Sequence, residues 1–227
     1  MITRRRFLEG GLASLLAIDL LELAGFPPGE PDEPREAPEM NIKKVMADRR
    51  TVRQYLSTPI EPDQFRAILW AAQGVTDAGR GHRTVPSAGA LYPLEVYAFT
   101  GEKTVLDLSA GIYRFVPGTG KPEKTGGQDS RAQLARACLS QMWVAQAPVS
   151  LVISAVYERT TVKYGRRGVR YADIEAGCAA QNVFLMAVSL GLAAGIVGAF
   201  EDEDVRRLTG AGEGSTPLLV MPLGYSA

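Results

Sequence analysis

The stretch from Ala176 to Leu190 constrains the fold more than any other segment. Apart from one thiol, its only polar side chains are Gln181, Asn182 and Ser189. A helix that is apolar on every side must be covered on every side. The chain has 227 residues, enough for one domain with a substantial core. A second copy of the chain is one way to cover such a helix completely.

Charge and composition argue against several classes of protein. The chain has 25 basic and 25 acidic residues, so no net positive field attracts nucleic acid. The single histidine, His82, does not suffice for a catalytic zinc site, which needs several His or Cys ligands. Cys138 and Cys178 lie far apart in apolar helix-like runs, which predicts buried free thiols. We therefore expect no nucleic-acid partner and no bound metal.

Residues 1–25 have the order of regions of an export signal. Arg4, Arg5 and Arg6 precede Phe7-Leu8, and a mostly apolar run follows over 12–23. Paired arginines before Phe-Leu resemble the twin-arginine export class, which predicts delivery to the periplasm or cell envelope. The run is too short for a stable membrane span. Two acidic residues interrupt it, so an amphipathic helix on a cytoplasmic protein is the alternative.

Residues 26–40 contain five prolines and several acidic residues. This composition predicts an extended linker. The folded domain is therefore expected to cover 41–227.

Helix and strand patterns alternate through that domain. Helices are expected at 41–48, after the prolines near 59–62, and at 130–146, 171–190 and 202–208. Strands are expected at 94–100, 111–116, 149–156, 195–197 and 217–223. The Gly-, Pro- and Lys-rich segment 117–128 predicts an exposed loop.

Two segments have residues suited to a ligand. Arg49, Arg50 and Arg53 lie within five residues, with Thr51 between them. Guanidinium groups suit phosphate, although a solvated basic turn has the same pattern. The stretch 86–93 places small side chains between two prolines, so a flat group could approach its backbone closely. A tight loop entering a strand has the same composition.

Four segments together resemble the FMN-dependent nitroreductase family. They are RRTVR at 49–53, LWAAQG at 69–74, PSAGALYP at 86–93, and a set within 170–200 that contains RY, EAG, QN, GL and VGAF. The resemblance covers about 41–225 in the family's order. The nearest branch resembles the SagB-type dehydrogenases, the azoline-oxidising components of thiazole/oxazole peptide maturases.

The resemblance implies an α+β fold with a central, mainly antiparallel sheet flanked by helices. It also implies a homodimer that binds FMN at the subunit interface. The implied cofactor-binding residues are Arg49, Arg50 and Thr51 at the phosphate and ribityl chain, Arg53 near N1 and the C2 carbonyl, Pro86, Ser87, Ala88 and Gly89 from the partner subunit, and Gly198 and Ala199, whose backbone N–H groups face N5 and O4.

The implied function is that of an oxidoreductase. Hydride passes through flavin N5 from NAD(P)H or an organic substrate to an acceptor, in alternating half-reactions. No side chain is expected to be catalytic, because the flavin supplies the chemistry. The substrate is expected to be a small molecule or a peptide, with nitroaromatics, quinones and azolines all compatible. The alternative is a flavin-binding or peptide-docking protein without turnover.

Two departures from the family pattern bear on the substrate and the phosphate. Cys178 stands where the SagB-type pattern has histidine, which weakens the case for a peptide azoline. Many relatives also have a basic residue in an arm after the last strand, whereas this sequence ends just past Tyr225. The cluster Arg166, Arg167 and Arg170 is the candidate source of that charge. This cluster and the loop 75–83 are also candidates for shaping the substrate pocket.

Overall fold

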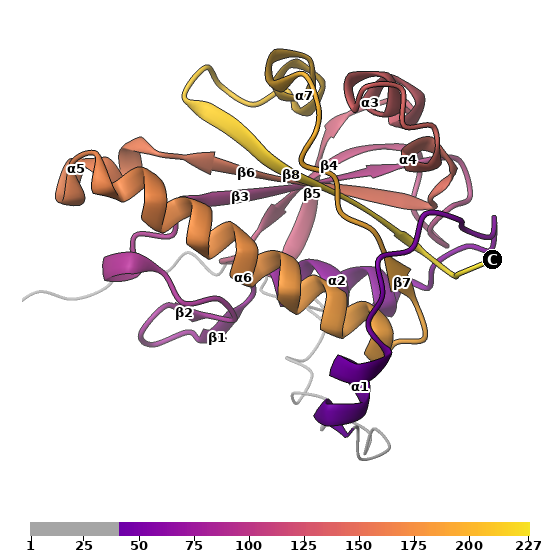
Figure 1. Ribbon diagram of the computed structural model, residues 1–227, viewed down its shortest axis with the longest axis horizontal. Coiled ribbons are helices and arrows are strands. Elements are labelled where there is room, and N and C mark those ends of the chain that lie inside the picture. The colour runs from indigo at the N-terminus through magenta and orange to yellow at the C-terminus, as the bar shows by residue number, and fades with distance from the viewer. Residues whose placement is uncertain (1–40) are drawn as a thin grey trace, which may run out of the picture. The chain divides into compact units, whose positions relative to one another are not determined.

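The computed structural model describes residues 41–227; the predicted export signal (1–25) and linker (26–40) lie outside these residues and stay predictions. Six strands form one sheet in the order β5-β4-β3-β6-β8-β7, and every neighbouring pair is antiparallel (Figure 1). The strands are β3 (Leu94–Thr100), β4 (Gly111–Val116), β5 (Lys121–Gly126), β6 (Val149–Val156), β7 (Ala193–Ala194) and β8 (Ser215–Gly224). A separate hairpin joins β1 (Val75–Asp77) to β2 (His82–Arg83).

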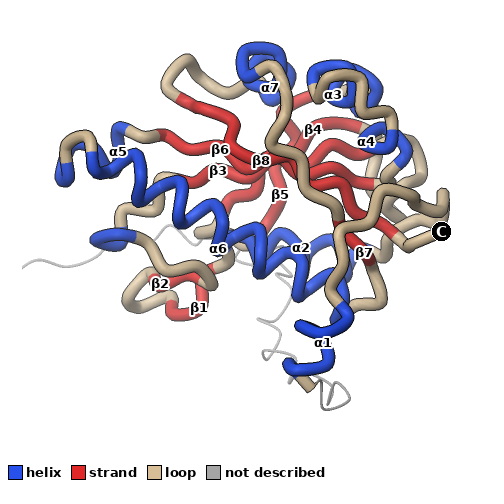
Figure 2. Tube along the Cα trace, in the orientation of Figure 1, coloured by secondary structure: helices blue, strands red, loops and turns tan. Residues whose placement is uncertain are grey.

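Helices cover both faces of this sheet (Figure 2). They are α1 (Ile42–Asp48), α2 (Pro62–Gln73), α3 (Arg131–Ala137), α4 (Trp143–Gln146), α5 (Glu158–Tyr164), α6 (Arg167–Ser189) and α7 (Asp202–Thr209), with a 3₁₀ turn η1 (Ala88–Ala90). This arrangement confirms the predicted α+β architecture with a mainly antiparallel sheet.

The alternation of β3 divides the core into two layers. Val96 and Ala98 pack with α2 and α6, whereas Tyr97 and Phe99 pack with α3, α4 and α7. Strand β6 is buried on both faces, which explains its uninterrupted apolar run. Among the described residues, none of the helices is both long and apolar enough to cross a bilayer.

Four sequence predictions are wrong. The segment 75–83, predicted as a loop, forms the β1–β2 hairpin, because its polar residues hide the short antiparallel pairing. The segment 117–128 contains β5, an edge strand where exposed charges and a proline are tolerated because one side needs no partner. The helix predicted at 130–146 is two helices, because Leu139 and Ser140 adopt φ values of 53° and 61°. The short strand pairs at 193–194 instead of 195–197, and Val197 forms an isolated bridge with Val220.

Helix α6 starts earlier than predicted and extends from α5 at one end to α1 at the other (Figure 1). One stripe of it is buried, but Ile174 is 56% exposed, and Gly177 and Gln181 are exposed as well. A single copy of the chain therefore does not cover this helix on every side.

Candidate functional site

The arginine loop, residues 49–53, follows α1 and is held against β7. Thr51 forms a parallel bridge with Ala194, and the Val52 N–H donates to the Ala194 carbonyl at 3.0 Å. The next residue, Gly195, must lack a side chain, because a Cβ there would lie 2.6 Å from both the Trp143 ring and the Val52 carbonyl oxygen. The two backbone segments thus fix each other at close range.

The arginine side chains of this loop contact rings and carbonyls. The Arg49 guanidinium lies 5.3 Å from the Phe184 ring centroid on α6, and that of Arg53 lies 5.7 Å from the Trp143 ring. Arg50 Nη1 donates to the Ala47 and Arg49 carbonyls. Within residues 41–227, none of the three forms an ion pair with a carboxylate. Their positive charges are available to an anion.

Phe184 connects Arg49 to an apolar cavity of about 390 Å³ between α6 and β8. Its lining is Asp173, Ala176, Gly177, Ala180, Gln181, Phe184, Ile196, Leu218 and Leu219. Ile196 leads directly to Gly198 and Ala199, which are exposed. Neither backbone N–H of these two residues has an acceptor in the described part of the chain, although the Ala199 carbonyl accepts from Gln141 Nε2 at 3.4 Å. The arginine loop, the cavity and these amides form the candidate site.

The Ser87 turn, residues 86–92, lies elsewhere. Its backbone has positive φ at Gly89 (64°), Ala90 (54°) and Tyr92 (45°), and Ser87 Oγ accepts from the Tyr92 N–H at 2.9 Å. A Cβ on Gly89 would lie 2.7 Å from Tyr164 Oη and 2.9 Å from Lys163 Nζ, so the turn packs closely on the end of α5. Pro86 to Gly89 therefore form a small surface that is held by the end of α5; whether a ring approaches it stays a prediction.

A buried polar network lies behind this turn. Glu175 on α6 is 2% exposed; its Oε1 accepts from Gln73 Nε2 at 3.4 Å, and Gln73 Oε1 accepts from Arg83 Nη1 at 2.8 Å. The Arg83 guanidinium lies 4.2 Å from the Tyr92 ring centroid. Burial raises the pKa of Glu175, while Ser87, Gln73 and Arg83 act to lower it. Glu175 Oε2 has no hydrogen-bonding partner of good geometry among the described residues.

In one chain, the predicted site residues fall into two groups. Phe184, beside Arg49, and Glu175, behind Ser87, are nine positions apart on α6, which corresponds to about 14 Å along the helix axis. The Ser87 turn also packs on the α2 side of α6, whereas the cavity lies on its β8 side. The chain thus brings Arg49–Arg53 together with Gly198 and Ala199, but not with Pro86–Gly89.

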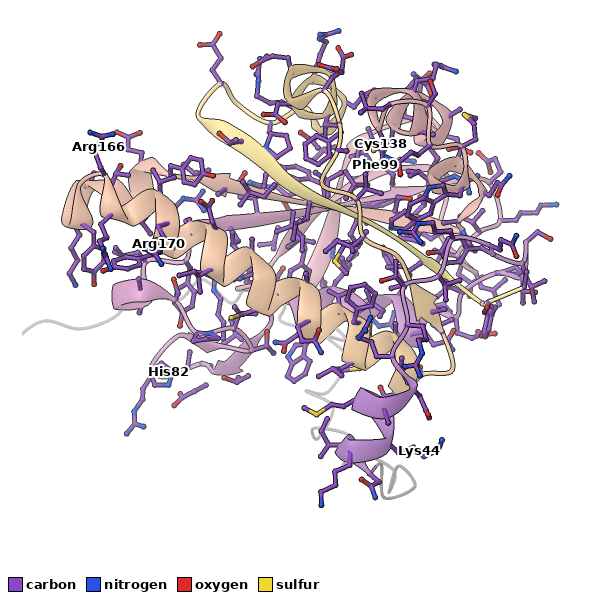
Figure 3. All side chains as sticks on the ribbon, viewed as in Figure 1. Lys44, His82, Phe99, Cys138, Arg166 and Arg170 are labelled. Atoms are coloured by element: carbon purple, nitrogen blue, oxygen red, sulfur yellow. The ribbon has the colours of Figure 1, made fainter. Side chains whose placement is uncertain are left out.

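Within one chain, the second arginine cluster, Arg166, Arg167 and Arg170, does not lie where it could add positive charge beside the arginine loop. Figure 3 shows Arg166 and Arg170 at the N-terminal end of α6, and Arg167 is its first residue. Phe184, which marks the position of Arg49, is 17 residues further along, or about 25 Å. These guanidinium groups cannot support Arg49 in the same copy.

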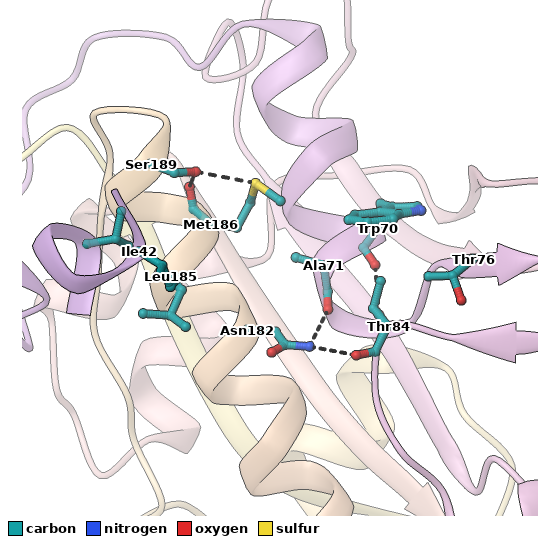
Figure 4. A pocket seen from close by; sticks show the side chains of 10 residues that line it. Ile42, Trp70, Ala71, Thr76, Thr84, Asn182, Leu185, Met186 and Ser189 are labelled. Atoms are coloured by element: carbon teal, nitrogen blue, oxygen red, sulfur yellow. Dashed lines mark hydrogen bonds between the residues drawn. The ribbon is translucent and has the colours of Figure 1, made fainter. Parts of the chain in front are cut away.

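A second cavity, of about 410 Å³, lies between α1, α2 and α6 (Figure 4). Its lining is largely apolar, and Asn182 Nδ2 at its edge donates to the Ala71 and Thr84 carbonyls. It has no cationic side chain and none of the predicted site residues. It is therefore a weaker candidate than the cavity beside Phe184.

The cysteines differ in their surroundings. Cys138 is fully buried, and burial raises the pKa of its thiol to about 12. Cys178 on α6 is only partly buried, so the expectation of two buried thiols is half right; both are free. Within residues 41–227, no three His, Cys, Asp or Glu side chains are grouped as metal ligands would be.

Sequence reasoning missed the partners of the site arginines. Trp143 and Phe184 have only their aromatic character as a signal, which does not distinguish them from core residues. Glu175 offered a clearer signal, since it is the acidic residue that immediately precedes the apolar stretch of α6. Its partners Gln73 and Arg83 come from α2 and β2, which no local pattern connects to it.

Known proteins resemble this chain in sequence. The model of the nitroreductase family matches residues 46–225. The protein MJ1384 of Methanocaldococcus jannaschii, provisionally named a nitroreductase, is 45% identical over 186 residues, or 82% of this chain and 91% of that protein. The microcin B17-processing protein McbC of Escherichia coli is 28% identical over 162 residues, or 69% of this chain and 59% of McbC.

Solved structures resemble it in fold. A provisionally assigned nitroreductase from Ralstonia eutropha JMP134 has a TM-score of 0.72 and 26% identity, covering 83% of this chain and 84% of that one. A chain of the E. coli microcin synthetase McbBCD complex with truncated pro-MccB17 bound scores 0.69 at 22% identity, covering 95% and 85%. The NADPH:FMN oxidoreductase of Vibrio harveyi with NAD⁺ scores 0.60 at 20% identity, covering 82% and 69%. The last two establish likeness of fold alone.

Proposed function

Because the chain belongs to the nitroreductase family, we propose that it is an FMN-dependent oxidoreductase that works as a homodimer. The observation that carries this proposal is the apolar cavity beside Phe184, which has Arg49 at its edge. From Ile196 on its wall, the backbone leads to the unpaired amides of Gly198 and Ala199.

The residues present fit this cofactor. A flavin has a flat, largely apolar ring system and a phosphate tail. The cavity of about 390 Å³ lies within the range of about 300–1,000 Å³ that is usual for ligand sites. Three arginines that have no carboxylate partner within residues 41–227 suit a phosphate dianion. Backbone donors without acceptors suit the polar edge of the ring.

When bound, FMN would supply reversible hydride transfer at N5. Arg49, Arg50 and Thr51 would hold its phosphate and ribityl chain. Arg53 would place a fixed positive charge where negative charge develops on reduction. The amides of Gly198 and Ala199 would orient the ring, and the apolar lining would exclude water from it.

What one chain leaves incomplete supports a homodimer. Pro86–Gly89 cannot reach the cavity of their own chain, because α6 lies between them. Large apolar side chains are also uncovered around α6, including Ile42 at 53% and Ile174 at 56% exposure. A second copy would cover them and bring Ser87 of the partner subunit to the ring.

The electron donor and the acceptor are proposed by class. The V. harveyi structure is named as an NADPH:FMN oxidoreductase, which supports NADPH and NADH as the donors to test first. Relation to the microcin B17-processing protein McbC supports a peptide as one substrate class. A peptide azoline would be oxidised to an azole and would therefore donate hydride to the flavin, whereas nitroaromatics and quinones are acceptor classes. Cys178, on the partly buried side of α6, does not contribute to the arginine loop or to the cavity.

The absorption spectrum of the purified full chain tests the proposal. We expect flavin bands, equimolar FMN released on denaturation, and bleaching by NADPH or NADH in anaerobic stopped-flow. Colourless protein that takes up no added FMN would contradict the cofactor assignment. Protein that binds FMN but is reduced by no donor would instead support flavin binding without turnover. Sedimentation as a monomer in the presence of FMN would overturn the dimer.

A further inference from the structure

A small pocket beside the Ser87 turn is rich in arginine. Its volume is about 170 Å³, and its lining is Arg83, Leu94, Glu95, Arg114, Phe115, Val116, Pro117 and Arg159. Three guanidinium groups against one carboxylate leave an excess of two positive charges on this lining. The side chains come from β2, β3, β4 and α5, so the cluster is a product of the fold rather than of a basic stretch of sequence.

Arg83 is the unusual member of this cluster. It is half-buried, yet among the described residues its direct partners are the neutral Gln73 amide and the Tyr92 ring. Burial is the main effect that lowers its pKa, and Arg159 lowers it further, while Tyr92 and the more distant Glu175 oppose this. A half-buried cation without a carboxylate in contact is costly unless a ligand supplies the negative charge.

Arg159 and Arg114 are fixed by their own partners. Arg159 Nη2 donates to Glu95 at 2.6 Å, and its Nη1 donates to the Tyr92 carbonyl at 3.4 Å. Arg114 Nη2 lies 3.4 Å from Glu123, in an exposed pair. Arg83 and Arg159 thus approach Tyr92 from its ring and from its carbonyl, two like charges held near each other before any ligand binds. Preorganised guanidinium groups of this kind suit an anion that contacts both.

We propose that this pocket binds an anionic group, a carboxylate or a phosphate, carried by the electron donor or the acceptor. Tyr92 ends the Ser87 turn, so an anchored anion would lie next to the segment proposed to line the partner's flavin. The assignment of the anion to a redox substrate rests on the proposed function. The binding of an anion between Arg83 and Arg159 does not.

Binding of inorganic phosphate tests the site itself. The full chain is first saturated with FMN, so that the arginine loop is occupied, and phosphate is then titrated by calorimetry and by thermal shift. We expect Arg83→Met to weaken phosphate binding about tenfold or more, because a charge-assisted hydrogen bond is lost. Arg80→Met is the matched control, because Arg80 is an exposed arginine of the same hairpin, 4.0 Å from Asp77.

Unchanged phosphate binding in R83M, or no phosphate binding to the parent chain, overturns the proposal. If R83M does not fold, the same titration is made on Arg159→Met, which removes another guanidinium group from the lining of this pocket. If the chain takes up no FMN, the titration is done on a variant with Arg49→Ala and Arg50→Ala. Loss of phosphate binding on adding R83M to that variant would then support the anion site even though the flavin proposal had failed.

Steady-state kinetics distinguishes the sources of the anion. A higher KM for NADPH alone in R83M assigns the pocket to the 2′-phosphate, and a higher KM for both NADPH and NADH assigns it to their pyrophosphate. A higher KM for 4-nitrobenzoate, with nitrobenzene unchanged, assigns it to an acceptor carboxylate. If no KM changes, the assignment to a substrate is wrong.

Discussion

Arginine side chains have different surroundings in the arginine loop and in the polar network behind the Ser87 turn. In the loop, Arg50 and Arg53 are exposed, and in the part of the chain that the structure describes they contact backbone carbonyls and a ring. In the network, Arg83 is half-buried and bonds to Gln73, which bonds in turn to a fully buried Glu175. The loop arginines bind no anion until a ligand arrives, whereas in the network Gln73 and Glu175 already bind each other, and Arg83 is the one member that also faces the proposed anion pocket.

This difference predicts which property each region controls. Removing an exposed, unpaired cation removes little that holds the fold together, so the effect should fall on ligand binding. Removing a member of a buried network leaves its partners unsatisfied, so the effect should fall on stability. Substitutions in the two regions should therefore change different measured properties.

The largest expected effect is on FMN binding. Replacing Arg49 and Arg50 together by alanine should weaken FMN affinity by about 100-fold, because two charge-assisted contacts to the phosphate are lost. Flavin fluorescence titration measures this. The melting temperature of the FMN-free protein should stay close to that of the parent chain.

The control for this double variant is Lys43→Ala with Lys44→Ala, which removes two exposed cations from the neighbouring helix α1. If both double variants lose affinity equally, general electrostatic attraction explains the result and the phosphate role of the arginine loop is wrong.

For Glu175→Ala, we expect a loss of stability of the FMN-free protein. Loss of the buried side chain and of its bond to Gln73 should destabilise the fold by about 2–4 kcal/mol, measured by urea unfolding of the FMN-free protein. Arg170→Ala, an exposed change on the same helix, should cost almost nothing. Equal stability of the two variants would show that the buried network does not stabilise the fold.

A smaller cost is expected at Gly89. Alanine there must adopt φ near 64°, and its Cβ would approach Tyr164 Oη at 2.7 Å. We expect a loss of about 1–2 kcal/mol from the left-handed backbone. The double variant with Tyr164→Phe should recover the part that is due to the hydroxyl contact. No recovery would mean that the backbone conformation explains the whole cost.

The two regions also differ in how far the sequence alone predicted them. Arg49, Arg50 and Arg53 were predicted because they form a local basic pattern, and Gly198 and Ala199 because the family resemblance implies them. The parallel bridge between Thr51 and Ala194 holds the arginine loop beside the segment that leads to them. The network was not predicted, because Gln73 and Glu175 are 102 residues apart and meet only when α2 packs on α6. Strands β3 and β6 were predicted from their apolar runs, whereas β5 was missed because an edge strand needs no buried face.

The smallest expected effect is the pH dependence of stability that comes from Glu175, and it separates the charge of this side chain from its packing. Burial raises the pKa of Glu175 above its ordinary value of 4.5, and Ser87, Gln73 and Arg83 offset part of this. A carboxyl group whose pKa is raised by folding favours the folded state while it is protonated. That contribution is complete below the ordinary pKa and declines as the pH rises through the higher folded-state value.

Glu175→Gln keeps the shape of the side chain and carries no titrating group. The free energy of unfolding of the parent chain should therefore fall relative to that of E175Q between about pH 4 and neutrality, in urea titrations at several pH values. If the difference were independent of pH, the favourable partners of Glu175 would cancel the effect of burial on its pKa, and if it grew in favour of the parent chain, the Arg83 charge would outweigh burial. Arg83 would then already have its counter-ion in Glu175, and the contrast with the arginine loop would disappear.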